Sequence, residues 1–549
     1  MSQETNGVKY ATSFKEQFTL RGMLIGSAGA IVLTMSSMYV ALKLGALPWP
    51  IIFVALVSMF FLKLLGKTNI NEINVTHTAM SAGAMTAGGV AFTLPGIFIL
   101  NPDSDVSLVN ILMVVLGGVL LGLIFTALIR KYFVVTKDLP YPMGQAAAET
   151  LIVGDEGGKK SITLFTSLAL AAIFTIARDW FKLFPAATLN SKLMGYGSLT
   201  GVWWSPMLIA VGYVIGPVYV GVWFLGAVLG DFGILVGGTE AGLWDVATAA
   251  TIKSSLGIGL MVGTGIGIIV KGIIPKAKEI FGPMFSKEAL GQGFISLRWA
   301  PIAMVLLAAL FTTVLKMGVV ASIITILGVW LATSMSAQMV GQTGINPMEV
   351  FGIIVLLAAK AASSIGQTEA FFVAGIVAVA CGLAGDVMND FKAGHILHTD
   401  PKAQWIAECI GGLIGAFVSV GVFYVILTAY GPTAFGNQEM FVAPQASAVA
   451  AMVGGIPHMT SFIIGLIAGC VLYILNFPVM TLGLGVYLPF YLSLTAFIGG
   501  ALKFLVQKFA PQFDKGGNGM VIAAGLLGGE AVIGVIIALI QAIPAFLAI

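Results

Sequence analysis

Charged side chains are scarce in this 549-residue sequence. Only 9% of the residues are Asp, Glu, Lys or Arg, whereas 58% are hydrophobic. A soluble domain has roughly 25% charged residues, and a soluble chain of this length would form several domains that these charges could not cover. Disorder is excluded as well, because it requires low hydrophobicity. An integral membrane protein remains.

Cysteines and nucleotide-binding motifs are also lacking. Cys381, Cys409 and Cys470 lie far apart in or beside apolar runs, so neither a disulfide framework nor a metal cluster is predicted. GGKKS at 157–161 lacks the glycine spacing of a P-loop. The glycines of 257–267 lie in an apolar run, where helix packing is the better interpretation. With no nucleotide site and no predicted cofactor, transport by this chain would be driven by an ion gradient.

Continuous apolar runs of about 20 residues dominate the chain, which is the length of a membrane-spanning helix. We predict an all-α polytopic membrane protein with about sixteen transmembrane helices (14–16), because the strands of a barrel would alternate in polarity instead. Two shorter stretches, 140–154 and 443–457, are rich in Pro, Ala and Gly. They are predicted to be short spans or re-entrant half-helices, which are tolerated inside protein or around a watery cavity.

The distribution of Lys and Arg in short connections predicts the orientation. Residues 1–20 form a polar tail with Lys9 and Lys15, whereas the connection NPDSD at 101–105 has two acids and no base. The N-terminus is therefore placed in the cytoplasm, and the apolar run after Met23 is predicted to be a retained helix rather than a signal peptide. The polar stretch 271–298 is predicted to be a large cytoplasmic loop.

The chain repeats itself after 297 residues. Without a gap, this shift places Pro50 on Pro347, Lys63 on Lys360 and Glu72 on Glu369. We predict a tandem duplication with a junction near Pro301, which gives a first transmembrane repeat at 21–300 and a second at 301–549. Two related halves around one site are a recurrent design of secondary transporters.

Polar clusters inside the apolar chain are the candidates for function, because an ionisable group in lipid is costly and rarely kept without a role. Glu72, in the cluster 69–78, is predicted to carry a proton, with its repeat mate Glu369 and with Glu149 as further candidates. Amides and hydroxyls at helical spacing are predicted to bind substrate: Asn71, Asn74, His77, Thr78, Gln145, Gln342, Asn346 and Gln367. The alternatives are helix caps at the membrane surface and, for Glu149, an ordinary solvated side chain.

A further polar motif, GDVMNDFKAG, occupies 385–394. Asp386 and Asp390 are four residues apart and would face the same way on a helix, with Lys392 able to neutralise one of them. Because the motif adjoins a polar stretch, we assign Asp386, Asn389, Asp390 and Lys392 to gating or to loop architecture. His395 and His398, just after it, are read as solvated side chains rather than metal ligands, so no metal site is predicted.

Four of these stretches together resemble the oligopeptide transporter (OPT) family. They are NINEINVTHTAMSAG, LPYPMGQAAAETLIVG, GDVMNDFKAGHILHTDPKAQ and GVYLPFYLSLTAFIG, in order along nearly the whole chain. The resemblance is to a prokaryotic member related to the yellow-stripe-like branch. It implies about sixteen helices that arose by duplication, and proton-coupled uptake of small peptides or of metal chelates.

The leading hypothesis is therefore a proton-coupled symporter for small oligopeptides or peptide-like metal chelates in the inner (plasma) membrane. It is not an enzyme, and its partners are substrate, protons and the lipid bilayer, without nucleic acid; a homodimer is one option for its assembly. One alternative is a membrane-embedded transferase in which Asp386 and Asp390 hold a magnesium-bound diphosphate, although we find no further acid near them in the chain. A channel is the other.

Overall fold

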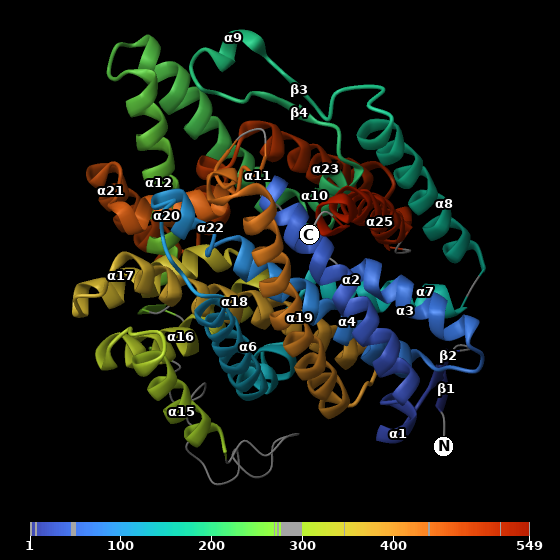
Figure 1. Cartoon of the computed structure of the whole chain (residues 1–549). Helices are drawn as coiled ribbons and strands as arrows, with labels where there is room; N and C mark the ends of the chain where they lie inside the picture. Colours follow the sequence, from blue (N-terminus) through green and yellow to red (C-terminus); the bar gives the residue numbers. More distant parts are fainter. Residues whose placement is uncertain are drawn as a thin grey trace. The chain divides into compact units, whose positions relative to one another are not determined.

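The computed structural model describes residues 3–5, 8–44, 51–156, 158–267, 270–271, 274–275, 299–344, 346–437, 440–515 and 518–547. Helices make up nearly all of it (Figure 1). The chain divides into two compact units, and each unit is discontinuous in the sequence. Most of the predicted cytoplasmic loop at 271–298 lies outside the described residues.

The first unit comprises Met1–Gly157, Lys276–Gly454 and Gly534–Ile549. Its elements are β1 (Gln3–Thr5), β2 (Val8–Tyr10), α1 (Phe14–Gln17), α2 (Leu20–Leu44), α3 (Ile51–Leu64), α4 (Ile70–Ala91), α5 (Gly96–Leu100), α6 (Leu108–Arg130), η1 (Lys131–Thr136), α7 (Pro142–Glu156), α15 (Ala300–Thr313), α16 (Val319–Thr343), α17 (Met348–Ala362), α18 (Gln367–Ile396), α19 (Pro401–Tyr430), η5 (Pro432–Ala434) and α20 (Pro444–Gly454).

The second unit comprises Gly158–Pro275 and Gly455–Ile533. Its elements are α8 (Gly158–Thr175), η2 (Ile176–Trp180), β3 (Ala187–Leu189), α9 (Ser191–Met194), β4 (Gly201–Trp203), α10 (Pro206–Ile215), α11 (Pro217–Val228), η3 (Leu229–Gly238), α12 (Val246–Gly267), α21 (Met459–Ile474), α22 (Val479–Tyr487), α23 (Phe490–Phe509), α24 (Pro511–Lys515) and most of α25 (Asn518–Leu547). The segments η1, η2 and η3 are π-helical.

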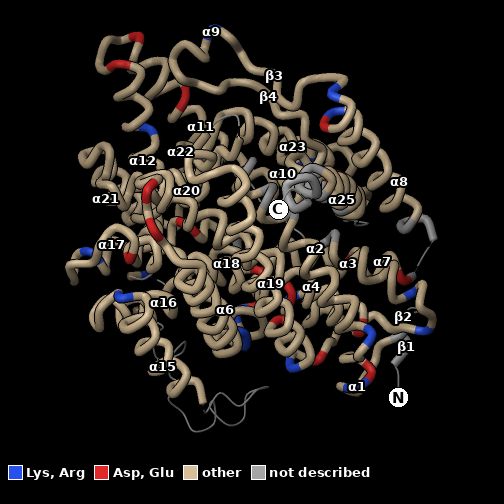
Figure 2. Tube along the Cα trace, in the orientation of Figure 1, with Lys and Arg blue, Asp and Glu red and all other residues tan. Residues whose placement is uncertain are grey.

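The chain is an all-α polytopic membrane protein. Among the described residues, nine helical segments are long and apolar enough to cross a membrane, or ten if α20 and α21 count as one broken span. Strands occur there only as two antiparallel pairs, β1 with β2 and β3 with β4. The predicted count of about sixteen is not supported, because several of the expected spans are short helices such as α3 (14 residues) and α10 (10 residues). Figure 2 shows how few charged residues these helices carry.

The starts of α4 and α19 can be traced to their sequences. Asn69 caps α4 by accepting the backbone N–H of Glu72 at 2.8 Å. Pro401 occupies the first turn of α19, where its missing N–H costs nothing, and Asp400 caps that helix. At the other end of a helix, Gly344 has φ +72° and ends α16 in the left-handed conformation that glycine favours.

Two helices in the second half of the chain begin at positions equivalent to those of two helices in the first half. Helices α3 and α4 begin at Ile51 and Ile70, and α17 and α18 begin at Met348 and Gln367, in each case 297 residues later. Glu72 and Glu369 are each the third residue of their helix. The two compact units nevertheless do not coincide with the halves 21–300 and 301–549, since each unit contains helices from both. The duplication itself stays a prediction.

The core of the first unit is built on α4 and α18, which are buried along almost their whole length. Small residues allow the backbones to approach closely, as is common in membrane proteins. A Cβ on Gly411 or Gly415 of α19 would overlap the backbone of α4 at Ala79 and Gly83. Helices α4, α18 and α19 therefore hold their polar side chains within reach of one another.

Glycines play the same part in the second unit. A Cβ on Gly259 or Gly263 of α12 would overlap backbone oxygens of α21, at Phe462 and Leu466. On the facing helix, Gly465 and Gly469 meet α12 at Leu256 and Leu260 in the same way. The interpretation of the glycine run 257–267 as a helix-packing surface is confirmed.

Candidate functional site

Three carboxyl groups meet in the core of the first unit. Asp386 and Asp390 are one turn apart on α18, and Glu408 comes from the second turn of α19. All three side chains are fully buried. One oxygen of each lies within 4.8 Å of an oxygen of the others. The prediction that Asp386 and Asp390 face the same way is confirmed, and Glu408 completes a group that we call the acid cluster.

Helix α4 contributes a histidine and a serine to the acid cluster. His77 Nε2 lies 3.0 Å from Asp390 Oδ1, and Ser81 Oγ donates to Asp390 Oδ2 at 2.5 Å. His77 and Ser81 are four residues apart and both are fully buried, so one face of α4 serves both oxygens of Asp390. Gln404 donates to the backbone oxygen of Asp390 at 2.7 Å and fixes the position of α19 beside it.

Asp386 and Glu408 differ from Asp390 in their surroundings. Neither oxygen of either carboxyl group has a hydrogen-bond partner among the described residues, and His77 Nδ1 has none there either. Two carboxylates 4.8 Å apart would repel each other by about 3 kcal/mol even at an effective dielectric constant of 20, and burial adds a further penalty for each charge. Three ionised carboxylates at this place would therefore be strongly destabilised.

Lys392 does not neutralise the acid cluster, contrary to the prediction. Its Nζ donates to Asp138 Oδ1 at 2.6 Å, in the connection before α7. This hydrogen bond and the positive charge of Lys392 lower the pKa of Asp138. Residues 385–394, which we assign from the sequence to gating or to loop architecture, form buried turns of α18 rather than a loop, and the gating role stays a prediction. Asn389 serves the packing of α7 there, because its Oδ1 accepts the N–H of Gly144 at 3.1 Å.

The predicted substrate-binding amides of α4 are used within the protein. Asn71 accepts the N–H of Ala11 at 2.8 Å and donates to the Leu397 oxygen at 2.8 Å. Asn71 and Asn74 both donate to Thr399 Oγ1, at 3.1 and 2.9 Å, so their shared face is confirmed. They bind the turn between α18 and α19 and the segment before α1. Thr78 Oγ1 donates to the Asn74 oxygen within α4 at 2.9 Å.

Glu72 is not the isolated carboxylate that the sequence suggested. Arg21 Nε and Nη2 donate to its two oxygens, each at 2.7 Å. Thr19 and Thr68 donate to the same carboxylate at 2.6 and 2.7 Å. A carboxylate with a forked guanidinium partner and two hydroxyl donors is strongly held in its charged form.

The remaining candidates lie apart from the acid cluster in sequence and environment. Gln145 and Gln367 are exposed, and Glu149 and Glu369 are partly buried. Asn346 is buried, where its Oδ1 accepts from Ser336 at 3.0 Å and its Nδ2 donates to the Cys381 oxygen at 2.8 Å. Gln342 belongs to α16, and its side chain lies outside the described residues. His395 and His398 are exposed, as expected.

Sequence reasoning missed Glu408 and Ser81. Glu408 is an acid inside an apolar segment that is long enough to span the membrane, Pro401–Tyr430, and that signal was available from the sequence. The expectation that no further acid lies near Asp386 and Asp390 is wrong. Ser81 had no such signal, because a serine in an apolar helix most often bonds to its own backbone.

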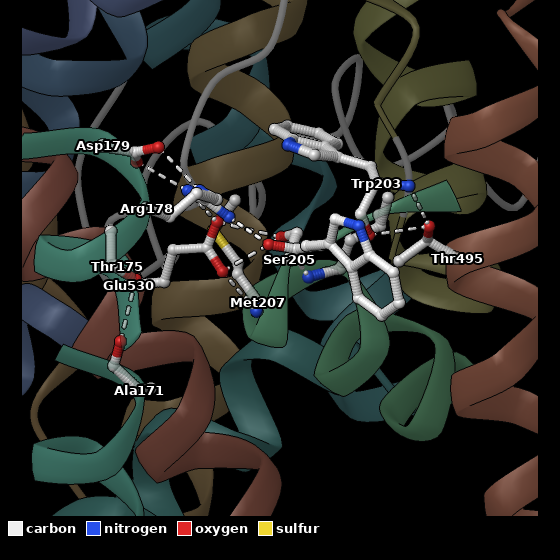
Figure 3. Close-up of polar contacts among 11 residues, drawn as sticks. Ala171, Thr175, Arg178, Asp179, Trp203, Ser205, Met207, Thr495 and Glu530 are labelled. Atoms are coloured by element: carbon white, nitrogen blue, oxygen red, sulfur yellow. Dashed lines mark hydrogen bonds and ion pairs between the residues drawn. The ribbon is translucent and has the colours of Figure 1, made fainter. Parts of the chain in front are cut away.

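The second unit has a polar centre of its own, which is fully paired (Figure 3). Arg178, in η2, donates from Nε and Nη2 to Asp179, each at 2.6 Å, and Nη2 also donates to Glu530 at 3.0 Å. Glu530 further accepts from Ser205 Oγ at 2.9 Å and from the N–H of Met207 at 2.7 Å. This network joins η2, α25 and the start of α10.

Sequence comparison identifies the family. Residues 17–541 match the family described as OPT oligopeptide transporter protein. The chain belongs to this family. A Haemophilus influenzae protein named "Putative oligopeptide transporter" is 26% identical over 92% of each chain. "Probable metal-nicotianamine transporter YSL6" of Oryza sativa subsp. japonica is 21% identical over 80% of this chain and 76% of its own. "Metal-nicotianamine transporter YSL3" of Arabidopsis thaliana is 31% identical, over only 19% of this chain and 16% of its own.

The resemblance predicted from the sequence motifs is confirmed. An OPT-family chain with many apolar helices is a membrane transporter and not an enzyme. The transferase alternative is therefore set aside, although its two aspartates do lie side by side on α18.

Proposed function

We propose that this OPT-family chain is a secondary active transporter that couples the uptake of small peptides, or of peptide-like metal chelates, to protons. The observation that carries the proposal is the family match over residues 17–541. The names of the relatives supply both substrate classes, which share amine and carboxylate groups. The chain contains no P-loop motif, and this favours an ion gradient as the source of energy.

The proposal includes the finer topology predicted from the sequence. The chain would lie in the inner (plasma) membrane with a cytoplasmic N-terminus, as the Lys and Arg bias favours. Its two halves would be tandem repeats, and a count of about sixteen spans would include the shorter helices. The equal offset of α3 and α4 from α17 and α18 supports the repeat. Whether two copies of the chain associate is a separate question, for which size measurements in detergent are suited.

Substrate binding is proposed for polar groups that are not already engaged within the protein. Gln145 and Gln367 fit this condition best among the predicted residues, because their side chains are exposed. Asn71 and Asn346 fit less well, because both amides are occupied by described partners. A zwitterionic substrate must exchange its hydration shell for such groups.

Proton coupling requires an acid that changes its charge during transport. Glu72, Glu149 and Glu369 were the predicted carriers. The ion pair with Arg21 makes Glu72 the least suited of these, because a carboxylate held by a guanidinium releases its charge reluctantly. The acid cluster supplies acids without such a partner.

The test is uptake by the full chain in proteoliposomes. The probes are radiolabelled trialanine and an iron–nicotianamine complex, each with and without an imposed inward proton gradient. We expect one of them to accumulate above its external concentration only when the gradient is present. Equilibration without accumulation would show a channel, and uptake driven equally well by a sodium gradient would contradict proton coupling.

A further inference from the structure

We propose that Asp386 and Glu408 form the proton-carrying pair of the transport cycle, while both oxygens of Asp390 are engaged by His77 and Ser81. This inference rests on the proposed function, because it names the residues on which the coupling proton travels. It differs from the sequence-based assignment, in which Glu72 was the first candidate and Asp386 was assigned to gating or to loop architecture.

The division of roles follows from the partners of each carboxyl group. Asp390 has His77 Nε2 at 3.0 Å on one oxygen and the Ser81 hydroxyl at 2.5 Å on the other. Both oxygens of Asp390 therefore have a partner on α4. Asp386 and Glu408 have no donor on any of their four oxygens among the described residues. Carboxyl groups in such different environments differ in their affinity for a proton.

The position of Glu408 is independent evidence that the aspartate pair belongs to a binding site. It belongs to another helix, its side chain is fully buried, and one of its unpartnered oxygens lies within 4.8 Å of both aspartates. Placing a third acid against two others deep in a membrane protein is costly unless the group binds something positive. The acid cluster is thus arranged for a positively charged ligand.

The neighbouring basic groups do not supply that positive charge. Lys392 of α18 is bound to Asp138 at 2.6 Å. The guanidinium of Arg130 of α6 lies over the ring of Phe391, 5.0 Å from its centre. On α17, Lys360 donates to the Val453 oxygen at 2.8 Å, and the buried Glu349 adds no positive charge. On α4, Glu72 is held by Arg21, which leaves His77 as the basic group of that helix at the acid cluster.

A proton fits the acid cluster better than a metal ion does. A calcium ion takes six to eight oxygen ligands, whereas the acid cluster offers three acids and little else. Ser81 and His77 Nε2 are already turned to Asp390. Between the aspartates, α18 carries Val387, Met388 and Asn389, and the Asn389 oxygen already accepts the N–H of Gly144. A proton, in contrast to a metal ion, needs only one carboxylate oxygen to bind.

The proposed step moves a proton and no electrons. A carboxylate of the pair takes a proton from the side of higher proton concentration and becomes a carboxylic acid. The same O–H bond breaks when the site opens to the other side, and the proton leaves to water. The neutral pair is the form in which Asp386 and Glu408 can remain buried, as the structure shows them.

Glu408→Gln and Asp386→Asn are the variants that test the pair, with Glu240→Gln as the matched control. Glu240 is exposed in the second unit and accepts from the Tyr196 hydroxyl at 3.0 Å. In proteoliposomes with trialanine or iron–nicotianamine, we expect Glu408→Gln to lose gradient-driven accumulation and the accompanying proton flux. Counterflow exchange of labelled for unlabelled substrate should persist, because it needs no net proton movement. Glu240→Gln should behave like the native protein in both assays. Gradient-driven accumulation that survives in Glu408→Gln and Asp386→Asn would overturn the proposal.

Infrared difference spectroscopy tests protonation without measuring transport. In the native chain, isotope-labelled glutamate should shift a protonated-carboxyl band that belongs to Glu408, and Glu408→Gln should lack that band. Its absence from the native protein at neutral pH would overturn the proposal. So would stoichiometric binding of calcium or manganese by the native chain that Glu408→Gln abolishes. If the native chain accumulates neither probe, the proposed function fails, and the infrared bands still decide whether the pair holds protons.

Discussion

The role of a buried acid in this protein depends on its partner. Glu72 faces a guanidinium, Asp390 faces an imidazole, and Glu408 faces other acids. An arginine is charged at every accessible pH, so its partner stays charged as well. Glu408, by contrast, has no basic partner among the described residues, and its neighbours are the two aspartates of α18. The three acids therefore lie in three different electrostatic environments.

Glu72→Gln separates an anchoring role from a coupling role. The side chain ties Arg21, Thr19 and Thr68 to the start of α4. We expect the amide to lose the charge-assisted hydrogen bonds and to lower the free energy of unfolding by about 1–3 kcal/mol. The measurement is thermal unfolding in detergent, alongside gradient-driven uptake per folded molecule. Unchanged stability with abolished accumulation would restore Glu72 to the coupling role.

Asp138→Asn tests the ion pair with Lys392 through its pH dependence. Because Lys392 lowers the pKa of Asp138, the pair stabilises the folded protein fully above the ordinary aspartate pKa of about 3.9. This contribution is lost as the pH falls through the lowered value of the folded state. At neutral pH the variant should lose at most about 1 kcal/mol, since the Asp138 side chain is 70% exposed. Unfolding midpoints from neutral to acid pH should converge for the two proteins, and a constant difference would contradict the assignment.

The residue-scale features show what a sequence can and cannot predict. The four-residue spacing of Asp386 and Asp390 is sufficient to predict their common face. The partners of Asp390 are not predictable in the same way, because His77 lies 313 positions away and approaches only when α4 packs on α18. Pairing of Lys392 with the acid cluster was the simplest local expectation. It failed because a tertiary partner, Asp138, was closer to the end of the long side chain.

Within each unit, helices pack against one another through surfaces of small residues. The glycines of α12 and α21 meet each other's backbones, and glycines of α19 meet α4. Apolar sequence alone predicted the helices, and glycine spacing predicted close packing. The partner of each glycine surface was not predictable, because many apolar helices could offer a complementary face. The sequence also overestimated the length of some helices. Continuous apolar sequence does not show where one short helix ends and the next begins, as for α10 and α11.

Gly263→Ala tests the contact of α12 with α21. The added methyl group would overlap the backbone oxygen of Leu466, and displacing a packed helix costs about 1–3 kcal/mol. Gly221→Ala in α11 is the matched control, because its methyl group would meet no described atom within 4 Å. The control should be neutral or gain up to about 1 kcal/mol from helix propensity. Equal unfolding midpoints for the two variants would refute close packing at Gly263.

The Arg178–Glu530 network of the second unit predicts an asymmetry between two variants. Arg178→Met leaves Glu530 buried without its cation and should cost about 3–5 kcal/mol. Glu530→Gln leaves Arg178 paired with Asp179, so it should cost only about 1–3 kcal/mol. The double variant should cost less than the sum, because the two residues share one interaction. Unfolding of all three in detergent is the measurement, and additive losses would mean that the residues act separately.

The two compact units are each assembled from segments of both halves of the chain. The first unit combines α2–α7 with α15–α20, and the second combines α8–α12 with α21–α24 and most of α25. Within the first unit, α4 from the first half packs against α18 and α19 from the second, and the acid cluster with His77 exists only when all three are present. The polar faces of these helices are too costly to leave in lipid.

Dividing the chain at the predicted junction near Pro301 tests this interlocking. Expressed alone, residues 1–300 would present His77 and Ser81 of α4 without Asp390, and residues 301–549 would present the three buried acids without either donor. We expect each fragment alone to aggregate in detergent, because neither completes a compact unit. Co-expressed fragments should copurify as one monodisperse complex and regain gradient-driven uptake, since the contacts that join the halves are noncovalent. If residues 1–300 alone gave a stable, monodisperse protein, the core around α4 would not depend on α18 and α19, and the assignment of the acid cluster to a shared core would fail.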